Sequence, residues 1–237
     1  MSAREEMLAR IRRANTTAAG QPGAGQHGAG QHGAGQAGHG DGSSGPDGEP
    51  AATPYRTHGD RGTAQLMDLF AGRLTDYKAL VRSTSADRLA AEVAAALTRR
   101  RARRVVVPAG LDLHGLDGLP LEAELITDDG LDVRALDACD GAVTGAAVAI
   151  AETGTIVLDG SPDQGRRAIT LVPDYHLCIV RAEQVVELVP EAITRLSASA
   201  DRPLTWISGP SATSDIELER VEGVHGPRTL EVILVEP

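Results

Sequence analysis

From Tyr55 to the C-terminus, short apolar runs of β-forming residues alternate with amphipathic runs of helical period, and this alternation constrains the fold most. The strand-like runs are 104–108, 121–127, 141–150, 155–159, 177–180, 204–208 and 230–235. The helical runs are 63–82, 85–100, 132–139 and 182–196, the last interrupted by Pro190. Strands alternating with helices predict a three-layer α/β domain with a mostly parallel sheet flanked by helices. The tight connection at 151–154 predicts a hairpin, so the sheet is expected to be mixed.

The N-terminal part of the chain differs in composition from this domain. Residues 1–17 predict a short amphipathic helix, with Met7, Leu8 and Ile11 on its apolar side. A helix this short is marginal alone, so it is expected to dock on the main body or on another copy in a homo-oligomer. Residues 18–54 hold 12 of the 27 glycines and no large apolar side chain, which predicts a disordered linker. The α/β domain is therefore predicted over 55–237.

Charge and aromatic content exclude one class of partner. The net charge is −10 and aromatic residues make up 2% of the chain. An acidic chain repels phosphate backbones and has few rings on which bases could stack, so no nucleic acid partner is expected. The longest suggestive uncharged stretch, 141–151, is too short to span a bilayer, so no membrane association is expected either.

Cysteine usage and motif absences limit the chemistry further. Cys139 and Cys178 are too few for a four-cysteine iron–sulfur cluster and fit a reducing cytoplasm. H-E-x-x-H and C-x-x-C are both absent, so no metal site is expected. G-x-G-x-x-G begins at Gly23, Gly28 and Gly33, but no strand precedes it and no helix follows. We therefore expect no bound cofactor.

The first segment that could carry chemistry is the connection after the run 141–150. Glu152 follows eleven uncharged residues, so its carboxylate leaves an apolar run abruptly and suits a general base or a nucleophile. Thr153, Gly154 and Thr155 add hydroxyl groups and exposed amides that suit an anion. The alternative interpretation is a turn whose glutamate points to water.

Two later glycine-containing loops also lie next to predicted strands. The loop after 204–208 supplies Ser208, Gly209, Ser211 and Asp215 as candidates for anion binding. The loop 223–228 supplies His225 as a second catalytic candidate, with Gly226 and Arg228 as ligand contacts. A capped turn and an exposed β-turn are the alternative interpretations. We expect Glu152, the serine loop and His225 to meet in one pocket at the carboxyl edge of the sheet, holding a small carboxylate ligand.

Together these segments resemble a known family in order and spacing. The matching stretches are A-I-A-E-T-G-T-I-V-L at 149–158, I-S-G-P-S-x-T-x-D-I-E at 207–217 and G-V-H-G-P at 223–227, with V-V-V-P-x-G-L at 105–111 and R-L-x-D-Y at 73–77. They are similar to the lactate-utilisation protein C family, a LUD-domain family. The resemblance covers about 55–235. The family often has arginine where Ala212 stands, so one anion contact is expected to be missing here.

The resemblance implies a fold similar to the sugar-isomerase and CoA-transferase-like superfamily. It also implies a bacterial, cytoplasmic role beside iron–sulfur partner proteins that oxidise L-lactate to pyruvate. Because this chain cannot hold the clusters, it is expected to be a non-redox subunit of that system. The competing hypothesis is a stand-alone CoA-transferase-like or isomerase-like enzyme that uses Glu152, since E-T-G at 152–154 resembles the catalytic glutamate turn of some CoA transferases.

Overall fold

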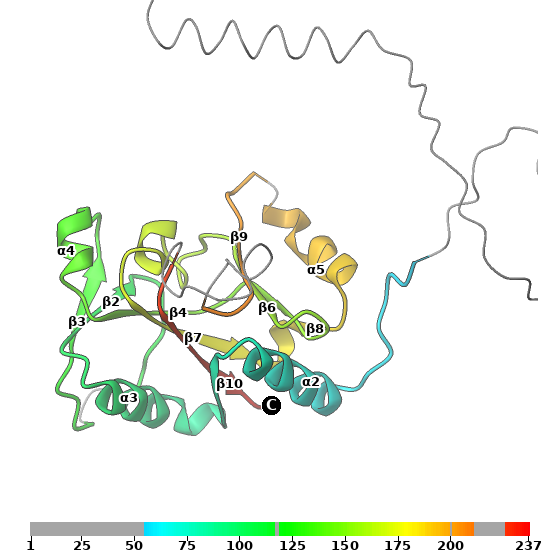
Figure 1. The fold of residues 1–237 in the computed structure, drawn as a ribbon, viewed down its shortest axis with the longest axis horizontal. Coiled ribbons are helices and arrows are strands. Elements are labelled where there is room, and N and C mark those ends of the chain that lie inside the picture. Colours follow the sequence, from blue (N-terminus) through cyan, green and yellow to red (C-terminus); the bar gives the residue numbers. More distant parts are fainter. Residues whose placement is uncertain (1–54, 117–118, 200, 211–225) are drawn as a thin grey trace, which may run out of the picture. The chain divides into compact units, whose positions relative to one another are not determined.

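A computed structural model describes residues 55–116, 119–199, 201–210 and 226–237. The N-terminal helix and the glycine-rich linker predicted from the sequence lie outside the described residues. Within the described part, a six-stranded central sheet runs in the order β1-β10-β7-β4-β2-β3, and every neighbouring pair in it is parallel (Figure 1). Its strands are β1 (Leu80–Thr84), β10 (Thr229–Val235), β7 (Tyr175–Arg181), β4 (Gly141–Thr144), β2 (Arg104–Pro108) and β3 (Glu124–Asp128).

A second, four-stranded sheet has the order β8-β5-β6-β9. It is formed by β8 (Val185–Val186), β5 (Val148–Ile150), β6 (Thr155–Leu158) and β9 (Thr205–Ile207). The pair β5–β6 is the antiparallel hairpin that the sequence predicts, but it belongs to this second sheet and not to the main one. The run 141–150, predicted as one strand, divides between the two sheets. The chain leaves the central sheet at Gly145, whose amide donates to the carbonyl of Asp163 at 2.9 Å.

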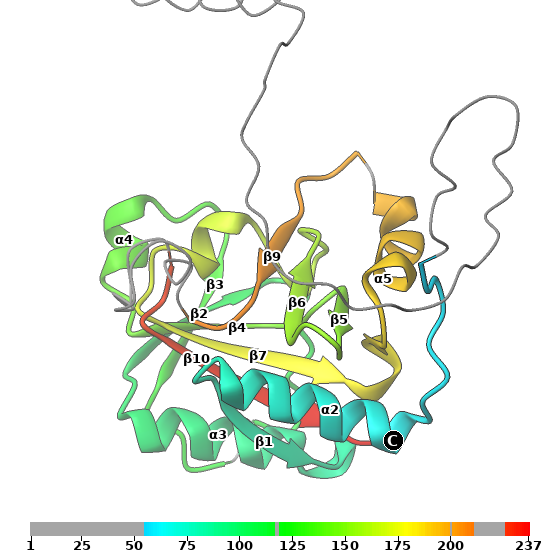
Figure 2. The same ribbon diagram turned by 45° about the vertical axis from the view of Figure 1, so that its right-hand side comes forward.

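The two faces of the central sheet are covered differently. Helix α3 (Leu89–Arg100) packs on one face, where Val93 and Leu97 meet Val105, Leu177 and Ile233. Helix α2 (Thr63–Asp76) and the second sheet cover the opposite face, where Phe70 and Leu74 pack in one cluster with side chains of β6, β7 and β10. Figures 1 and 2 show this arrangement, with α3 below the central sheet and the second sheet above it. The predicted three-layer α/β class is therefore confirmed.

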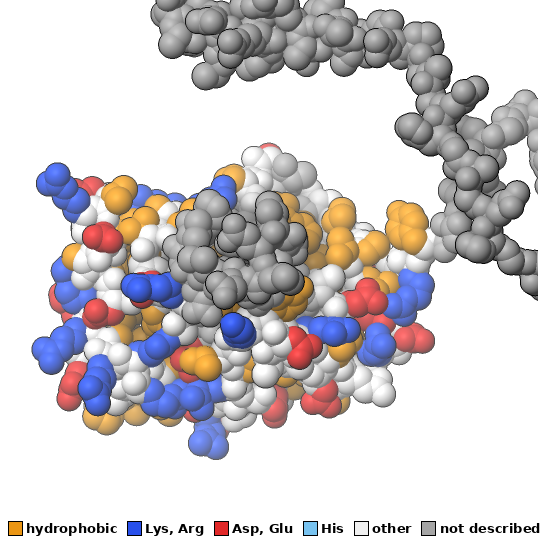
Figure 3. All heavy atoms as spheres, viewed as in Figure 1, with side chains coloured by type: hydrophobic (Ala, Val, Ile, Leu, Met, Phe, Trp, Pro, Cys, Tyr) orange, Lys and Arg blue, Asp and Glu red, His pale blue; other side chains and the backbone are white. Residues whose placement is uncertain are grey.

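Shorter helices complete the outer cover. Helix α5 (Val189–Leu196) packs through Ala192 and Leu196 on the second sheet, against Val148, Ile150 and Val157. Helix α4 (Val133–Asp137) and the 3-10 helix η2 (Arg167–Thr170) cover the β2–β4 part of the central sheet. No helix in the described part of the chain combines the length and apolar character that crossing a bilayer requires. Basic and acidic side chains are intermixed over the described part of the face in Figure 3.

Two predicted helices are shorter than their apolar periodicity indicates. The helix predicted to Arg82 ends at Asp76, because the chain turns through Lys78 with φ of 64° and continues as β1. The predicted helix 182–196 is in fact three elements: the 3-10 turn η3 (Ala182–Gln184), β8 and α5. Pro190 lies in the first turn of α5, where its missing amide costs nothing. It therefore marks a helix start and not a kink.

Candidate functional site

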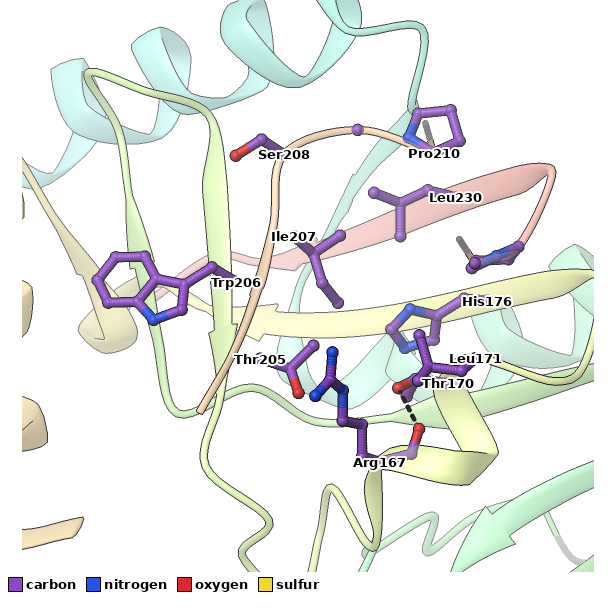
Figure 4. A pocket seen from close by; sticks show the side chains of 13 residues that line it. Arg167, Thr170, Leu171, His176, Thr205, Trp206, Ile207, Ser208, Pro210 and Leu230 are labelled. Atoms are coloured by element: carbon purple, nitrogen blue, oxygen red, sulfur yellow. Dashed lines mark hydrogen bonds between the residues drawn. The ribbon is translucent and has the colours of Figure 1, made fainter. Parts of the chain in front are cut away.

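A cavity of about 430 Å³ opens over the amino ends of β7 and β10, and we call it the amino-end cavity. Strand β9 and the loop after it form one wall, η2 forms another, and His176 and Leu230 belong to the central sheet beneath (Figure 4). The sequence predicts a pocket at the carboxyl edge of the strands. The difference arises because β9 belongs to the second sheet, and its carboxyl end lies over the amino ends of central strands.

Three of the residues predicted from the sequence line this cavity: Ser208, Gly209 and Gly226. Thr153 and Thr155 do not line it, but they connect to it through hydroxyl groups. Thr153 Oγ1 donates to Thr155 Oγ1 at 2.8 Å, and Thr155 Oγ1 shares a 2.8 Å hydrogen bond with Ser208 Oγ. The hairpin turn and the serine loop are therefore adjacent, as the single-pocket hypothesis requires. Ser211, Asp215 and His225 lie outside the described residues.

Gly154 and Gly209 have positive φ angles of 61° and 79°. The atoms nearest to both belong to the end of α2. A Cβ built on Gly154 would lie 2.8 Å from Cβ of Arg73, and one built on Gly209 would lie 2.8 Å from Cβ of Tyr77. These glycines allow the hairpin turn and the serine loop to approach the helix closely, which is a packing role.

Glu152 belongs to a separate polar cluster, the hairpin cluster, formed by Glu152, Glu187, Arg56 and Arg61. The side chain of Glu152 is 47% exposed, and its Oε1 pairs with the guanidinium of Arg56 at 3.1 Å. Arg56 also reaches Glu187 at 3.2 Å, and Arg61 pairs with the same carboxylate. Backbone amides of Asp60 and Arg61 donate to Glu187 Oε2 at 3.0 and 3.1 Å. The cluster fastens the segment before α2 onto the second sheet.

Arg228, predicted as a ligand contact, has a different partner. Its Nε donates to Oδ1 of Asp174 at 2.6 Å, and both side chains are more than half exposed. This ion pair raises the pKa of Arg228 through the hydrogen bond to Asp174. Arg228 is not among the described residues that line the cavity. Its charge is already matched in the structure.

His176 is a cavity residue that the sequence reasoning missed. It is the second residue of β7 and is 1% exposed. Its Nε2 shares a 2.8 Å hydrogen bond with Oγ1 of Thr144, whereas its Nδ1 is buried without a hydrogen-bond partner among the described residues. Burial lowers the pKa of His176 from 6.5 to about 4, so the ring is neutral near pH 7. The available signal was a histidine directly before the apolar run 177–180.

Arg167 is the second missed residue, and its guanidinium, unlike those of Arg166 and Arg202, has no partner among the described residues. Arg166 holds Asp128 with two hydrogen bonds of 2.7 and 2.8 Å, and Arg202 lies 3.5 Å from Asp159. Among the described residues, no carboxylate or hydrogen-bond acceptor contacts the Arg167 guanidinium. Figure 4 shows its side chain extending from η2 into the space between Thr205 and His176.

Among the described lining residues of the cavity, Arg167 is the one charged side chain, and its charge is not matched by any of the others. No acidic residue is among its described lining residues, and His176 is uncharged. Hydroxyl groups of Thr170, Thr205 and Ser208 lie on the same walls. A cation with neutral hydrogen-bonding groups and no competing carboxylate attracts a small anion.

Neither cysteine is placed for nucleophilic chemistry. Cys178 follows His176 on the same face of β7, and burial raises the pKa of its thiol to about 12. Burial also raises the pKa of Cys139. Since the thiolate is the reactive form, both thiols are inert near neutral pH. In the described residues, no three His, Cys, Asp or Glu side chains are grouped to hold a metal ion.

Comparison with known proteins gives consistent matches. The LUD domain model matches residues 123–235. Lactate utilization protein C of Deinococcus radiodurans is 47% identical over 188 residues, which cover 78% of this chain and 86% of that protein. Lactate utilization protein C of Halalkalibacterium halodurans is 30% identical over 185 residues, covering 73% and 80%. The crystal structure of a DUF162 family protein from Deinococcus radiodurans superposes with a TM-score of 0.64 at 42% identity, covering 74% of this chain and 99% of that one.

Proposed function

The chain belongs to the lactate utilization protein C family of LUD-domain proteins, and from this we infer that it takes part in bacterial lactate utilisation. The observation that carries the inference is the 47% identity to a lactate utilization protein C over 86% of that protein's length. The match extends over 188 residues, which are 78% of this chain. The role in lactate utilisation is therefore supported by the relatives' names, and the more specific role depends on the chemistry of this chain.

We propose that the chain is a non-redox subunit that acts beside iron–sulfur proteins in oxidising L-lactate to pyruvate in the cytoplasm. Two cysteines cannot supply the four thiolates of an iron–sulfur cluster, and both are buried. Electrons removed from lactate must then travel through partner proteins. The contribution of this chain would be to bind and orient a small carboxylate.

The competing function, a stand-alone CoA-transferase-like or isomerase-like enzyme, is not favoured. It needs the Glu152 carboxylate as a nucleophile or base facing a substrate. Glu152 is instead half exposed and paired with Arg56, and it does not line the amino-end cavity. An ion pair with arginine stabilises the carboxylate and makes it a weaker nucleophile.

The test uses the source bacterium with the gene deleted. Growth on L-lactate should be lost and should return when the full chain is supplied from a plasmid, whereas growth on pyruvate should be unaffected. A tagged full chain purified without oxygen should carry iron–sulfur proteins, recognised by their visible absorption and by mass spectrometry. Normal growth of the deletion strain on lactate would overturn the role in lactate utilisation. Purification without any iron–sulfur protein would overturn the subunit role alone.

A further inference from the structure

The amino-end cavity combines a buried polar atom with a positively charged group, and neither has a partner among the described residues. One is the buried Nδ1 of His176, which has no hydrogen-bond partner, and the other is the guanidinium of Arg167, which no carboxylate contacts. A buried polar atom without a partner destabilises a fold, so proteins rarely retain one unless something else bonds to it. Both groups belong to the same cavity (Figure 4). One ligand could therefore satisfy both.

We propose that this cavity binds a small 2-hydroxy or 2-oxo carboxylate, with Arg167 pairing with the carboxylate and His176 Nδ1 bonding the oxygen on C2. The proposal rests on the function inferred above and names the site and the class of ligand. It concerns binding alone and involves no covalent step.

The assignment of Arg167 to the carboxylate follows from charge and accessibility. Arg167 is exposed and is the one charged side chain among the described lining residues of the cavity. Arg166 and Arg202, which line a second pocket that also includes Arg167, are paired with Asp128 and Asp159. A guanidinium holds a carboxylate through two parallel hydrogen bonds. Because no described lining residue is acidic, nothing in this part of the site competes with the ligand.

The assignment of His176 to the C2 oxygen follows from its hydrogen bonding. Thr144 engages Nε2 and leaves Nδ1 as the only free position of the ring. If the Thr144 hydroxyl donates to Nε2, Nδ1 carries the proton and donates. If Thr144 accepts, Nδ1 is an acceptor. A hydroxyl on C2 matches either tautomer because it both donates and accepts, whereas a C2 carbonyl matches only the first.

The remaining wall accounts for the rest of the ligand. Leu171, Ile207 and Leu230 contribute apolar side chains to the cavity. This surface suits the methyl group of a three-carbon acid or a longer alkyl group on the same carbon. The volume of about 430 Å³ is within the usual range of small-molecule sites and exceeds what a three-carbon acid fills. The class is therefore 2-hydroxy and 2-oxo acids with apolar substituents.

The experiment titrates the purified full chain with L-lactate, pyruvate and propionate, the last of which lacks the oxygen on C2. Binding is followed by NMR of ¹³C-labelled imidazole rings, and the His176 signal is identified by its absence in a His176 variant. L-lactate or pyruvate should shift the His176 signal and bind at least about tenfold more tightly than propionate, since one hydrogen bond separates them.

Variants of Arg167 and His176 test each contact. Arg167→Gln should weaken the binding of all three acids by about tenfold or more. Arg134→Gln makes the same change of charge at an exposed position on α4 and should leave binding unchanged. Glutamine at position 176 places its amide where Nε2 lies and keeps the Thr144 contact, whereas asparagine places its amide where Nδ1 lies. His176→Gln should therefore lose the preference for lactate over propionate, and His176→Asn should keep part of it.

Several results would overturn the proposal. If Arg167→Gln and Arg134→Gln bind the acids with equal affinity, Arg167 does not contact the ligand. Equal affinity for lactate and propionate would remove the C2 contact. If no acid shifts the His176 signal, Nδ1 is bonded to water only and the site does not exist. The last result combined with loss of lactate growth in the deletion strain would leave the proposed function standing and remove this inference alone.

Discussion

The hairpin cluster and the amino-end cavity differ in whether their polar side chains have hydrogen-bond partners. In the hairpin cluster, the side chain of Glu187 is 2% exposed, yet its oxygens bond Arg56, Arg61 and two backbone amides. In the cavity, the buried Nδ1 of His176 has no such partner among the described residues, and the exposed guanidinium of Arg167 has none either. An unsatisfied buried polar atom costs about 1–3 kcal/mol. The hairpin cluster, whose buried carboxylate has hydrogen-bond partners, therefore suits a structural role. The cavity, whose buried Nδ1 has none among the described residues, suits a bound ligand.

The largest effect expected from this comparison is on lactate growth. Arg167→Gln should reduce the growth rate on L-lactate to that of the deletion strain, because it removes the charge that holds the carboxylate. The side chain is exposed and makes no ion pair in the described structure, so the variant should fold as well as the original chain. Growth of the complemented deletion strain measures the first effect, and thermal unfolding measures the second.

Arg134→Gln is the matched control, since it changes the same charge on α4 away from the cavity. Growth at the original rate by Arg167→Gln would show that the cavity is not where this chain acts, and the contrast between the two regions would lose its functional meaning.

The next effect concerns the buried histidine. His176 has a pKa of about 4 in the folded chain and about 6.5 in the unfolded chain, so the unfolded chain binds a proton at higher pH. The stability that depends on neutral His176 is complete above about pH 6.5 and is lost as the pH falls toward 4. The difference between the folded and unfolded pKa values of His176 corresponds to a loss of about 3 kcal/mol of unfolding free energy over this pH range. Urea unfolding of the original chain and of His176→Gln across this range measures the difference.

The groups around His176 do not change charge in that range. Thr144 does not titrate, and the Cys178 thiol has a pKa of about 12. His114→Gln is the control, since its side chain is 94% exposed, and it should keep the full pH dependence. An identical pH profile for His176→Gln and the original chain would show that the ring is not held neutral by burial.

A smaller effect is expected at the glycine of the cavity rim. Gly209→Ala should destabilise the fold by about 2 kcal/mol, because its φ is positive and the new Cβ would lie 2.8 Å from Cβ of Tyr77. Gly72→Ala is expected to change the unfolding free energy in the opposite direction, because Gly72 lies within α2 and nothing is within 4 Å of an added Cβ. It should stabilise the helix by about 0.5–1 kcal/mol. Equal effects of the two substitutions in urea unfolding would argue against close packing at the rim.

The fold could be predicted where local chemistry alone decides the structure. The strand Arg104–Pro108 matches its predicted bounds, because three valines favour a strand and proline cannot continue the pairing. The end of α2 could not be predicted, because the spacing of Leu74, Tyr77 and Val81 suits a longer helix. The left-handed turn at Lys78 that ends the helix is closed by local hydrogen bonds, from the Lys78 amide to the Thr75 carbonyl at 2.8 Å and from the Ala79 amide to the Leu74 carbonyl at 3.0 Å. Glycine is the usual residue at such a turn, so a lysine there gives no signal in the sequence.

The candidate site divides in the same way. Ser208, Gly209 and Gly226 could be found because glycine and small hydroxyl residues mark loops in any sequence. Arg167 could not, because Arg166 and Arg167 are adjacent and only the fold brings Asp128, 38 positions away, to the first of them. His176 was missed because the predicted strand 177–180 begins one residue after it, whereas β7 begins at Tyr175. Its Nδ1 without a partner becomes visible only when its neighbours in the fold are known.

The smallest effect is expected where the sequence alone predicts the largest. Glu152→Gln should change the unfolding free energy by less than about 0.5 kcal/mol, since an exposed ion pair contributes little. It should also leave growth on L-lactate unchanged, because Glu152 lies in the saturated hairpin cluster and does not line the cavity. Urea unfolding and growth of the complemented deletion strain measure the two effects. Glu183→Gln, an exposed carboxylate on the nearby turn η3, is the matched control.

The outcome of this substitution decides between two interpretations of the same glutamate. If folded Glu152→Gln loses growth on lactate while Glu183→Gln keeps it, then a carboxylate satisfied by Arg56 nevertheless acts as a base or nucleophile. The presence of partners within the fold would then not distinguish structural from functional polar groups in this chain. Incubation with an acyl-CoA would identify which role it has, because a nucleophile gains mass on Glu152 as a thioester and a base does not. If growth is kept, the E-T-G turn is explained by its contact with α2 and by the Arg56 pair alone.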